Sequence, residues 1–305
     1  MLDNFFSVFS QVVVLFFLIF VGFLCGKLKF LSESSTKALT DLVLYFATPC
    51  MIVKSYLIEY DTQLLKSMVV SIVISLLIHI GFIALATVMF KKEHKQIYRF
   101  STVFSNAGYM ALPLQYAVLG DIGVFLGAGY VAVFNLVLWT YGVMCMQKNK
   151  ENFNLKKVII NPGVLSVIIG IIIFIFRLPL PEILTSAIGH MANLNTPLPM
   201  IIIGFYLSNI KFKELLCDYK NYIICGVRLL LFPAIALVVM YLAGVRSDML
   251  YSMTIAASAP TAAATTMFSV KYGHNPKISV SAVSLSTILS LITMPLMVAL
   301  AMLIG

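Results

Sequence analysis

Apolar runs about as long as a bilayer is thick follow one another along almost the whole sequence. A membrane-spanning helix needs roughly 20 predominantly apolar residues. By that measure the sequence predicts ten spans, joined by connections too short for a soluble domain. The predicted spans are 5–26, 36–57, 65–90, 99–119, 123–146, 158–177, 183–208, 220–243, 249–271 and 277–304. We therefore expect an all-α integral membrane protein.

The composition favours the same class of protein. The sequence is 61% hydrophobic and 11% charged, whereas a soluble domain carries about 25% charged residues. The net charge of +9 does not indicate nucleic-acid binding, because the basic residues lie in short loops between apolar runs. The cysteines show no CxxC or metal-ligand spacing. We expect the lipid bilayer as partner, and no nucleic acid, metal or other cofactor.

The basic loops also predict an orientation. Most Lys and Arg follow spans 1, 3, 5, 7 and 9, and the opposite side holds only Lys54, Lys66, Arg177 and Arg246. The positive-inside rule makes the Lys-rich side cytoplasmic. Both termini of this multi-pass protein of the plasma membrane would then be extracytoplasmic. No Lys or Arg precedes the first apolar run, so we expect a retained span and not a signal peptide.

Two predicted spans carry a proline among small and polar residues. These stretches are Ser105–Pro113 in span 4 and Ala257–Thr266 in span 9. Proline removes a backbone donor and clashes with the preceding turn, so each helix should kink or break. In a bilayer, such breaks persist only inside protein or beside a wet cavity, and paired breaks mark transporter binding sites. The predicted substrate-binding residues here are Asn106, Gly108, Tyr109, Pro113, Ser258, Pro260 and Thr261.

Each of these breaks also has a packing interpretation. Pro113 would free the carbonyl of Tyr109 and open the backbone to substrate, or it would only kink the helix. In the packing interpretation, the Asn106 amide hydrogen-bonds a neighbouring helix, and the hydroxyls of span 9 bond to their own helix.

Spans 2 and 7 contain further prolines, each beside Thr or Asn. The Thr and Asn side chains either replace missing backbone partners or bind a ligand, and the sequence does not decide between the two. The predicted binding residues are Thr48, Asn195 and Thr196, and the predicted helix breaks are Pro49, Pro197 and Pro199.

Proline spacing predicts a duplication. The number of residues between Pro49 and Pro113 is almost the same as the number between Pro197 and Pro260. Weak internal similarity of this kind is what an inverted repeat leaves in a sequence. With an odd number of spans in each half, the second half must insert upside down. The predicted units are a first five-helix repeat at 1–147, a short basic loop at 148–157 and a second repeat at 158–305.

Ionisable residues decide the predicted chemistry. Asp41 and Asp121 lie near span ends, and neither break contains a carboxylate. Helix breaks lined by amides and hydroxyls suit an anion, because the start of a half-helix presents free N–H groups and a positive dipole end. Arg228 in span 8 either adds positive charge to the site or extends to the membrane interface. His79 is interpreted as a packing residue.

Three stretches resemble the auxin efflux carrier family. Asn106–Pro113 (Asn-Ala-Gly-Tyr-Met-Ala-Leu-Pro) resembles its fourth-helix signature. Ala259–Thr261 followed by Tyr272-Gly273 is similar to its ninth-helix crossing, and Arg228–Pro233 to an eighth-helix pattern. The resemblance implies ten helices in two inverted five-helix repeats, with broken helices 4 and 9 crossing. It also implies a scaffold of helices 1, 2, 6 and 7, elevator-type motion and a homodimer through that scaffold.

The sequence therefore favours a secondary transporter of a small organic anion, such as a mono- or dicarboxylate or an auxin-like acid. A sodium-coupled symporter of the bile-acid type is the alternative, and a channel or membrane sensor is less favoured. An enzyme is not expected, because the chain has no HExxH, GxGD or Asp-rich prenyl-diphosphate motif.

Overall fold

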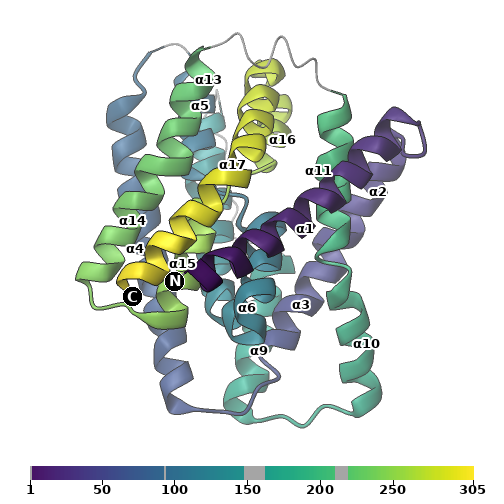
Figure 1. The fold of residues 1–305 in the computed structure, drawn as a ribbon, viewed down its shortest axis with the longest axis vertical. Helices are drawn as coiled ribbons and strands as arrows, with labels where there is room; N and C mark the ends of the chain where they lie inside the picture. Colours follow the sequence, from purple (N-terminus) through teal and green to yellow (C-terminus); the bar gives the residue numbers. More distant parts are fainter. Residues whose placement is uncertain (1, 93, 148–161, 210–218) are drawn as a thin grey trace.

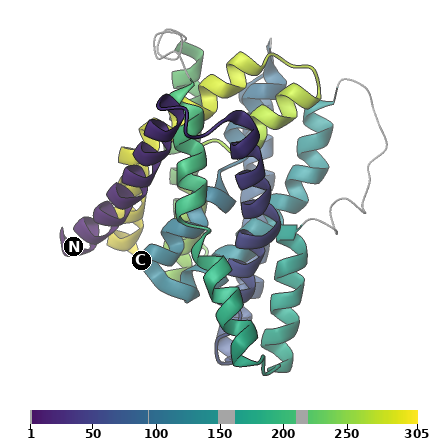
Figure 2. The same ribbon diagram turned by 90° about the vertical axis from the view of Figure 1, so that its right-hand side faces the viewer.

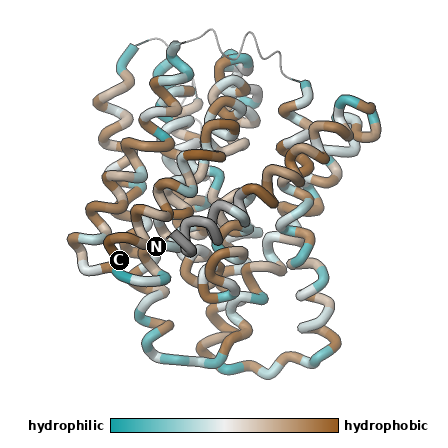
Figure 3. The backbone as a smooth tube through the Cα atoms, in the orientation of Figure 1, coloured by the Kyte–Doolittle hydropathy of each residue, from teal (hydrophilic) through white to brown (hydrophobic). Residues whose placement is uncertain are grey.

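The computed structural model describes residues 2–92, 94–147, 162–209 and 219–305, so the predicted loop 148–157 lies outside the described residues. No strand occurs in this part of the chain, which consists of helices and short connections (Figure 1). Hydrophobic residues cover most of the helices, and hydrophilic residues gather at their ends (Figure 3). The all-α prediction is confirmed.

Helix occupies most of the described part of every predicted span. The helices of the first half are α1 (Leu2–Lys27), α2 (Glu33–Leu42), α3 (Thr48–Ser55), α4 (Thr62–Met89), α5 (Lys95–Val103), α6 (Leu112–Val137) and α7 (Val143–Met146). Those of the second half are α9 (Pro162–Phe176), α10 (Glu182–Asn193), α11 (Pro197–Ser208), α13 (Tyr219–Gly226), α14 (Phe232–Leu242), α15 (Ser247–Ser258), α16 (Ala264–Lys271) and α17 (Pro276–Ile304). Four π-helical turns join some of them: η1 (Val43–Ala47), η2 (Ala107–Ala111), η3 (Leu138–Gly142) and η4 (Val227–Leu231).

Several helical stretches are long and apolar enough to cross a bilayer. They are Glu33–Ser55, Thr62–Met89, Ala107–Met146, Tyr219–Leu242 and Lys277–Ile304, and the shorter Val13–Lys27 and Pro162–Phe176 are also apolar. Stretches of this length and composition make the chain a multi-pass integral membrane protein.

Three prolines follow a π-helical turn without interrupting their helix. Pro49, Pro113 and Pro233 are each the second residue after η1, η2 and η4. At the second of these turns, the Leu112 N–H donates to the Ala107 carbonyl, five residues back. The wider turn gives the proline ring room without breaking the helix. Neither proline therefore interrupts its helix, although a break was predicted at Pro49 and a kink or break at Pro113.

Helix α6 folds back on itself at Gly120. This residue has φ 65° and ψ −152°, a conformation open almost only to glycine. The Gln115 side chain lies against Gly127, where an added Cβ would overlap it. The stretch Ala107–Met146 is therefore two helical arms joined by a tight turn, as predicted for spans 4 and 5.

True interruptions occur in three places. Helix α5 ends at Val103 before η2, and α15 ends at Ser258 before α16. Helix α10 ends at Asn193, and α11 begins at Pro197, where the missing N–H of proline costs nothing. Pro197, a predicted break, is the first residue of α11, whereas Pro199 lies inside the first turn of α11.

The helices form two groups in contact. One group, the α1–α11 group, contains α1, α2, α3, α9, α10 and α11. The crossing group contains α4 to α7 and α13 to α17. Contacts between the groups run from α6 to α3 and α9, and from α1 to α17 (Figures 1 and 2).

Glycines set the close crossing of α1 and α11 (Figure 2). A Cβ at Gly22 would overlap the Ile201 carbonyl, and one at Gly204 would overlap the Ile19 carbonyl. Small residues of this kind let membrane helices pack backbone to backbone.

We expect Gly22→Ala to destabilise the protein by about 1–3 kcal/mol, because the methyl group forces the two backbones apart. Thermal unfolding in detergent measures the change. Gly81→Ala is the matched control, since a Cβ on that exposed α4 glycine meets nothing within 4 Å. Equal melting temperatures for the two variants would contradict the packing argument.

Candidate functional site

The two predicted breaks meet. The Asn106 N–H donates to the Pro260 carbonyl at 2.7 Å, and the Ala262 N–H donates to the Phe104 carbonyl at 2.9 Å. Ser105 and Thr261 pair between them as an isolated antiparallel bridge. Each interruption thus supplies partners for backbone groups that the other leaves free, which is what a bilayer requires. The two interruptions therefore lie against each other, where a crossing of broken helices 4 and 9 was predicted.

Pro113 and Pro260 are not equivalent positions. Pro260 lies in the interruption between α15 and α16. Pro113 lies inside the helix that follows the other interruption, where it is buried. The use of these two prolines as matching landmarks of a repeat was therefore wrong.

Arg228 binds the ends of both half-helices that stop at the crossing. Its Nη1 donates to the carbonyls of Thr102 (2.9 Å) and Val103 (3.3 Å), at the end of α5. Its Nε donates to the Ala259 carbonyl at 3.2 Å, and its Nη2 donates to the Ala257 carbonyl, at the end of α15. The positive charge therefore lies where the two helix dipoles are negative.

The structure contradicts one of the two predicted alternatives for Arg228. The side chain is 0% exposed, so it does not extend to the membrane interface. Its donors point at main-chain carbonyls and not at a cavity. Sequence reasoning found this arginine but not its partners, because they are backbone atoms of two distant helices.

Aromatic rings and a histidine lie near the Arg228 side chain. The Arg228 guanidinium lies 5.6 Å from the centre of the Phe82 ring. His79 packs on Tyr130 with ring centres 4.9 Å apart, and its Nδ1 hydrogen-bonds the Ser75 carbonyl. As predicted, His79 packs inside the protein, although its Nε2 has no hydrogen-bond partner among the described residues.

The beginning of η2 carries unused donors. The Asn106 carbonyl accepts from the N–H groups of Met110 and Ala111. Within the described residues, the N–H groups of Gly108 and Tyr109 have no acceptor, and neither does the Asn106 amide, although Asn106 is only 5% exposed. A Cβ on Gly108 would meet nothing within 4 Å, so open space adjoins this turn. Free N–H groups at a helix start attract anions.

Tyr109 lies on the side of η2 that faces the α1–α11 group. It is half-buried and lies near Asp41 of α2, Tyr206 of α11 and Tyr45 of η1. The beginning of η2 therefore lies where the two helix groups meet, with Tyr109 directed toward the α1–α11 group.

The predicted hydroxyl ligands of span 9 bond to the protein. Ser258 donates to the Ile255 carbonyl of its own helix at 3.2 Å. Thr261 donates from Oγ1 to the Ser101 carbonyl at 3.0 Å, and its N–H donates to Ser286 Oγ. The Ser258 bond agrees with the packing interpretation, whereas the Thr261 hydroxyl bonds to α5 and not to its own helix.

Thr48 and Asn195 bond to each other across the α1–α11 group. Thr48 Oγ1 donates to Asn195 Oδ1 at 2.6 Å, and Asn195 Nδ2 lies 2.9 Å from Met51 Sδ. Asn195, which lies in the interruption between α10 and α11, is completely buried. These bonds join side chain to side chain, so the pair fastens α3 to the α10–α11 interruption and does not replace a missing backbone partner.

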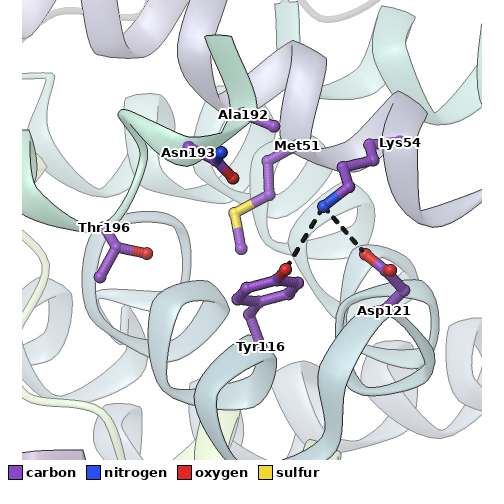
Figure 4. A pocket seen from close by; sticks show the side chains of 7 residues that line it. All are labelled: Met51, Lys54, Tyr116, Asp121, Ala192, Asn193 and Thr196. Carbon is purple, nitrogen blue, oxygen red and sulfur yellow. Dashed lines mark hydrogen bonds and ion pairs between the residues drawn. The ribbon is translucent and has the colours of Figure 1, made fainter. Parts of the chain in front are cut away.

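A cavity of about 190 Å³ opens between the two helix groups (Figure 4). Thr196 is the predicted site residue that lines it. Sequence reasoning missed the others, although Lys54 stood out as one of few basic residues on its side. The lining residues are Met51 and Lys54 of α3, Tyr116 and Asp121 of α6, Ala192 and Asn193 of α10, and Thr196.

Gln115 is another polar residue that sequence reasoning missed. It is completely buried, and its Nε2 donates to the Ser252 carbonyl of α15 at 2.7 Å. Ser252 Oγ in turn donates to the Gly123 carbonyl. A glutamine inside an apolar span was the available signal.

The fold and the crossing define a multi-pass membrane protein with two interrupted helices at its centre. The sequence model of the membrane transport protein family matches residues 7–157 and 151–298. The chain therefore belongs to this auxin efflux carrier-like family of membrane transport proteins.

Two archaeal relatives agree with that assignment. An uncharacterized transporter of Methanocaldococcus jannaschii is 24% identical over 93% of this chain and 96% of its own length. An uncharacterized transporter of Methanothermobacter thermautotrophicus is 23% identical over 63% of each chain. Family and relatives make the chain a transporter.

Proposed function

We propose that the chain is a secondary transporter of a small organic anion, a mono- or dicarboxylate or an auxin-like acid. The observation that carries this proposal is the buried Asn106 amide, free of partners among the described residues, beside the unused N–H groups of Gly108 and Tyr109. The family and the relatives support transport, and these donors support an anion as its cargo.

The donors at η2 match the chemistry of a carboxylate. A carboxylate only accepts hydrogen bonds, and a helix start offers N–H groups with a positive dipole end. Asn106 would bind one oxygen through its amide, while Gly108 leaves room for the second oxygen near the backbone. Pro260 would hold the crossing in place opposite this site through its bond from Asn106.

Elevator-type alternating access suits the division into two helix groups. The crossing group would carry the anion past the α1–α11 group, which corresponds to the scaffold that the resemblance implies. On this proposal the ten helices form inverted repeats at 1–147 and 158–305, and a homodimer forms through the scaffold. The protein would lie in the plasma membrane with both termini extracytoplasmic.

Sodium coupling, the alternative, has less support than transport without sodium. Carbonyl oxygens are the ligands that a hard cation prefers. At the crossing, carbonyls of α5 and α15 already accept hydrogen bonds from Arg228. A fixed guanidinium charge thus takes the place that a bound cation would need there.

Uptake into proteoliposomes tests the proposed function. Purified protein should give saturable flux of labelled malate, malonate or indole-3-acetate, with counterflow and without a requirement for sodium. Liposomes without protein supply the background. Absence of flux for all three acids in well-folded protein would overturn the proposal, and unsaturable flux without counterflow would indicate a channel instead.

A further inference from the structure

Lys54 joins the two helix groups (Figure 4). It lies in the last turn of α3, in the α1–α11 group. Its Nζ lies 3.8 Å from Asp121 Oδ1 and donates to the Tyr116 hydroxyl at 3.3 Å, and both partners belong to α6 of the crossing group. No other salt bridge is seen between two residues that the structure describes. Any motion between the groups must therefore act on this contact.

The ion pair lies at the wall of the 190 Å³ cavity. Lys54 is the only cation among the lining residues, and Asn193 and Thr196 add an amide and a hydroxyl from the α10 side. An ammonium group, a phenol, an amide and a hydroxyl together offer several donors to a carboxylate. The size of the cavity and these donors suit a small organic acid.

The Lys54–Asp121 pair is weak enough to be exchanged. The two side chains are 27% and 41% exposed, and ion pairs at such exposure contribute little to stability. Asp121 itself is a carboxylate that accepts from Lys54, as a substrate carboxylate would. It follows the Gly120 turn, where the two arms of α6 reverse direction, so a change at Asp121 acts directly on the crossing group.

We propose that this cavity is a substrate-access site, in which a carboxylate of the transported anion displaces Asp121 from Lys54. This inference rests on the proposed function and assigns that carrier a second anion site, apart from the η2 donors. Displacement removes the ion pair that joins the helix groups. Arrival of the substrate at Lys54 thereby frees the crossing group to move relative to the α1–α11 group.

The two partners of the ion pair have opposite roles in this proposal. Lys54 binds the substrate, whereas Asp121 competes with it. A contact that only fastened the groups together would behave differently, because loss of either partner would then have the same effect. The sign of the change in apparent affinity therefore separates the two cases.

Malate transport by single variants in proteoliposomes provides the test, with thermal stabilisation by malate in detergent as a second measurement of affinity. Lys54→Gln should raise the KM for malate about tenfold or more, since a charge-assisted bond is lost. Asp121→Asn should lower the KM about two- to fivefold, since an exposed competing pair is removed. Lys66→Gln, an exposed α4 residue outside the cavity lining, is the matched control and should leave the KM unchanged.

The outcomes of this test separate the inference from the function. Opposite changes in KM for Lys54→Gln and Asp121→Asn support the exchange. Equal changes in KM in both variants, or no change in either, overturn this inference. The proposed function still stands in that case if the wild-type protein transports malate. If wild-type protein transports none of malate, malonate and indole-3-acetate, the proposed function falls and this inference falls with it. Elution of both variants as a single species in size-exclusion chromatography checks that they fold.

Discussion

Arg228→Met is expected to destabilise the protein by about 3–5 kcal/mol, because four buried carbonyls of α5, α15 and the adjoining break would lose their donor. The two half-helix ends would then face each other with negative dipole ends and no compensating charge. Transport should be lost together with stability. Thermal unfolding in detergent and proteoliposome uptake measure the two effects.

Two further variants sharpen this result. Arg228→Lys keeps the charge but cannot reach carbonyls on both helices with a planar group, so its loss of stability should be intermediate. Arg246→Met is the matched control, because that exposed arginine donates to the Tyr241 and Val245 carbonyls near the end of α14. A melting temperature for Arg228→Met equal to that of the control would refute the role in the crossing.

Asn106→Ala is expected to lower transport about tenfold to a hundredfold, the loss of one hydrogen bond to a charged substrate. Stability should change little, because the side-chain amide of Asn106 bonds no described residue. The hydrogen bond from its backbone N–H to the Pro260 carbonyl is kept in the variant. Uptake normalised to folded protein in the membrane measures the effect. The result would separate substrate binding from packing at this position.

Asn135→Ala is the control for Asn106→Ala. Asn135 belongs to the same group, is partly buried and donates to the Val131 carbonyl of its own helix. It should retain wild-type transport. If Asn106→Ala instead lost folded protein and transport in equal measure, Asn106 would join helices, and the anion site would have to lie elsewhere.

The predicted spans and the crossing followed from residues that act locally. Apolar length places a helix in the bilayer whatever its neighbours are. Small and polar residues around Asn106 and Pro260 marked the two interruptions that the structure joins. The family resemblance rested on the same residues, and the match across the chain confirms it.

Other predictions failed because they depend on packing. Pro113 reads as a helix breaker, yet η2 widens one turn and the helix continues. Ser258 and Thr261 read as ligands, yet neighbouring backbone atoms accept their protons. A sequence shows which groups can donate, but not which acceptors the fold brings within reach.

The sequence by itself determined the class of protein, the helical ranges and the two interruptions, because hydropathy and proline chemistry act within one segment. Only the tertiary structure decided what these segments face. In the folded chain, Arg228 donates to carbonyls at the ends of α5 and α15, and the Asn106 side-chain amide has no partner among the described residues. Lys54 of one helix group pairs with Asp121 of the other. Those relations join residues far apart in the chain, so they exist only once the helices have packed.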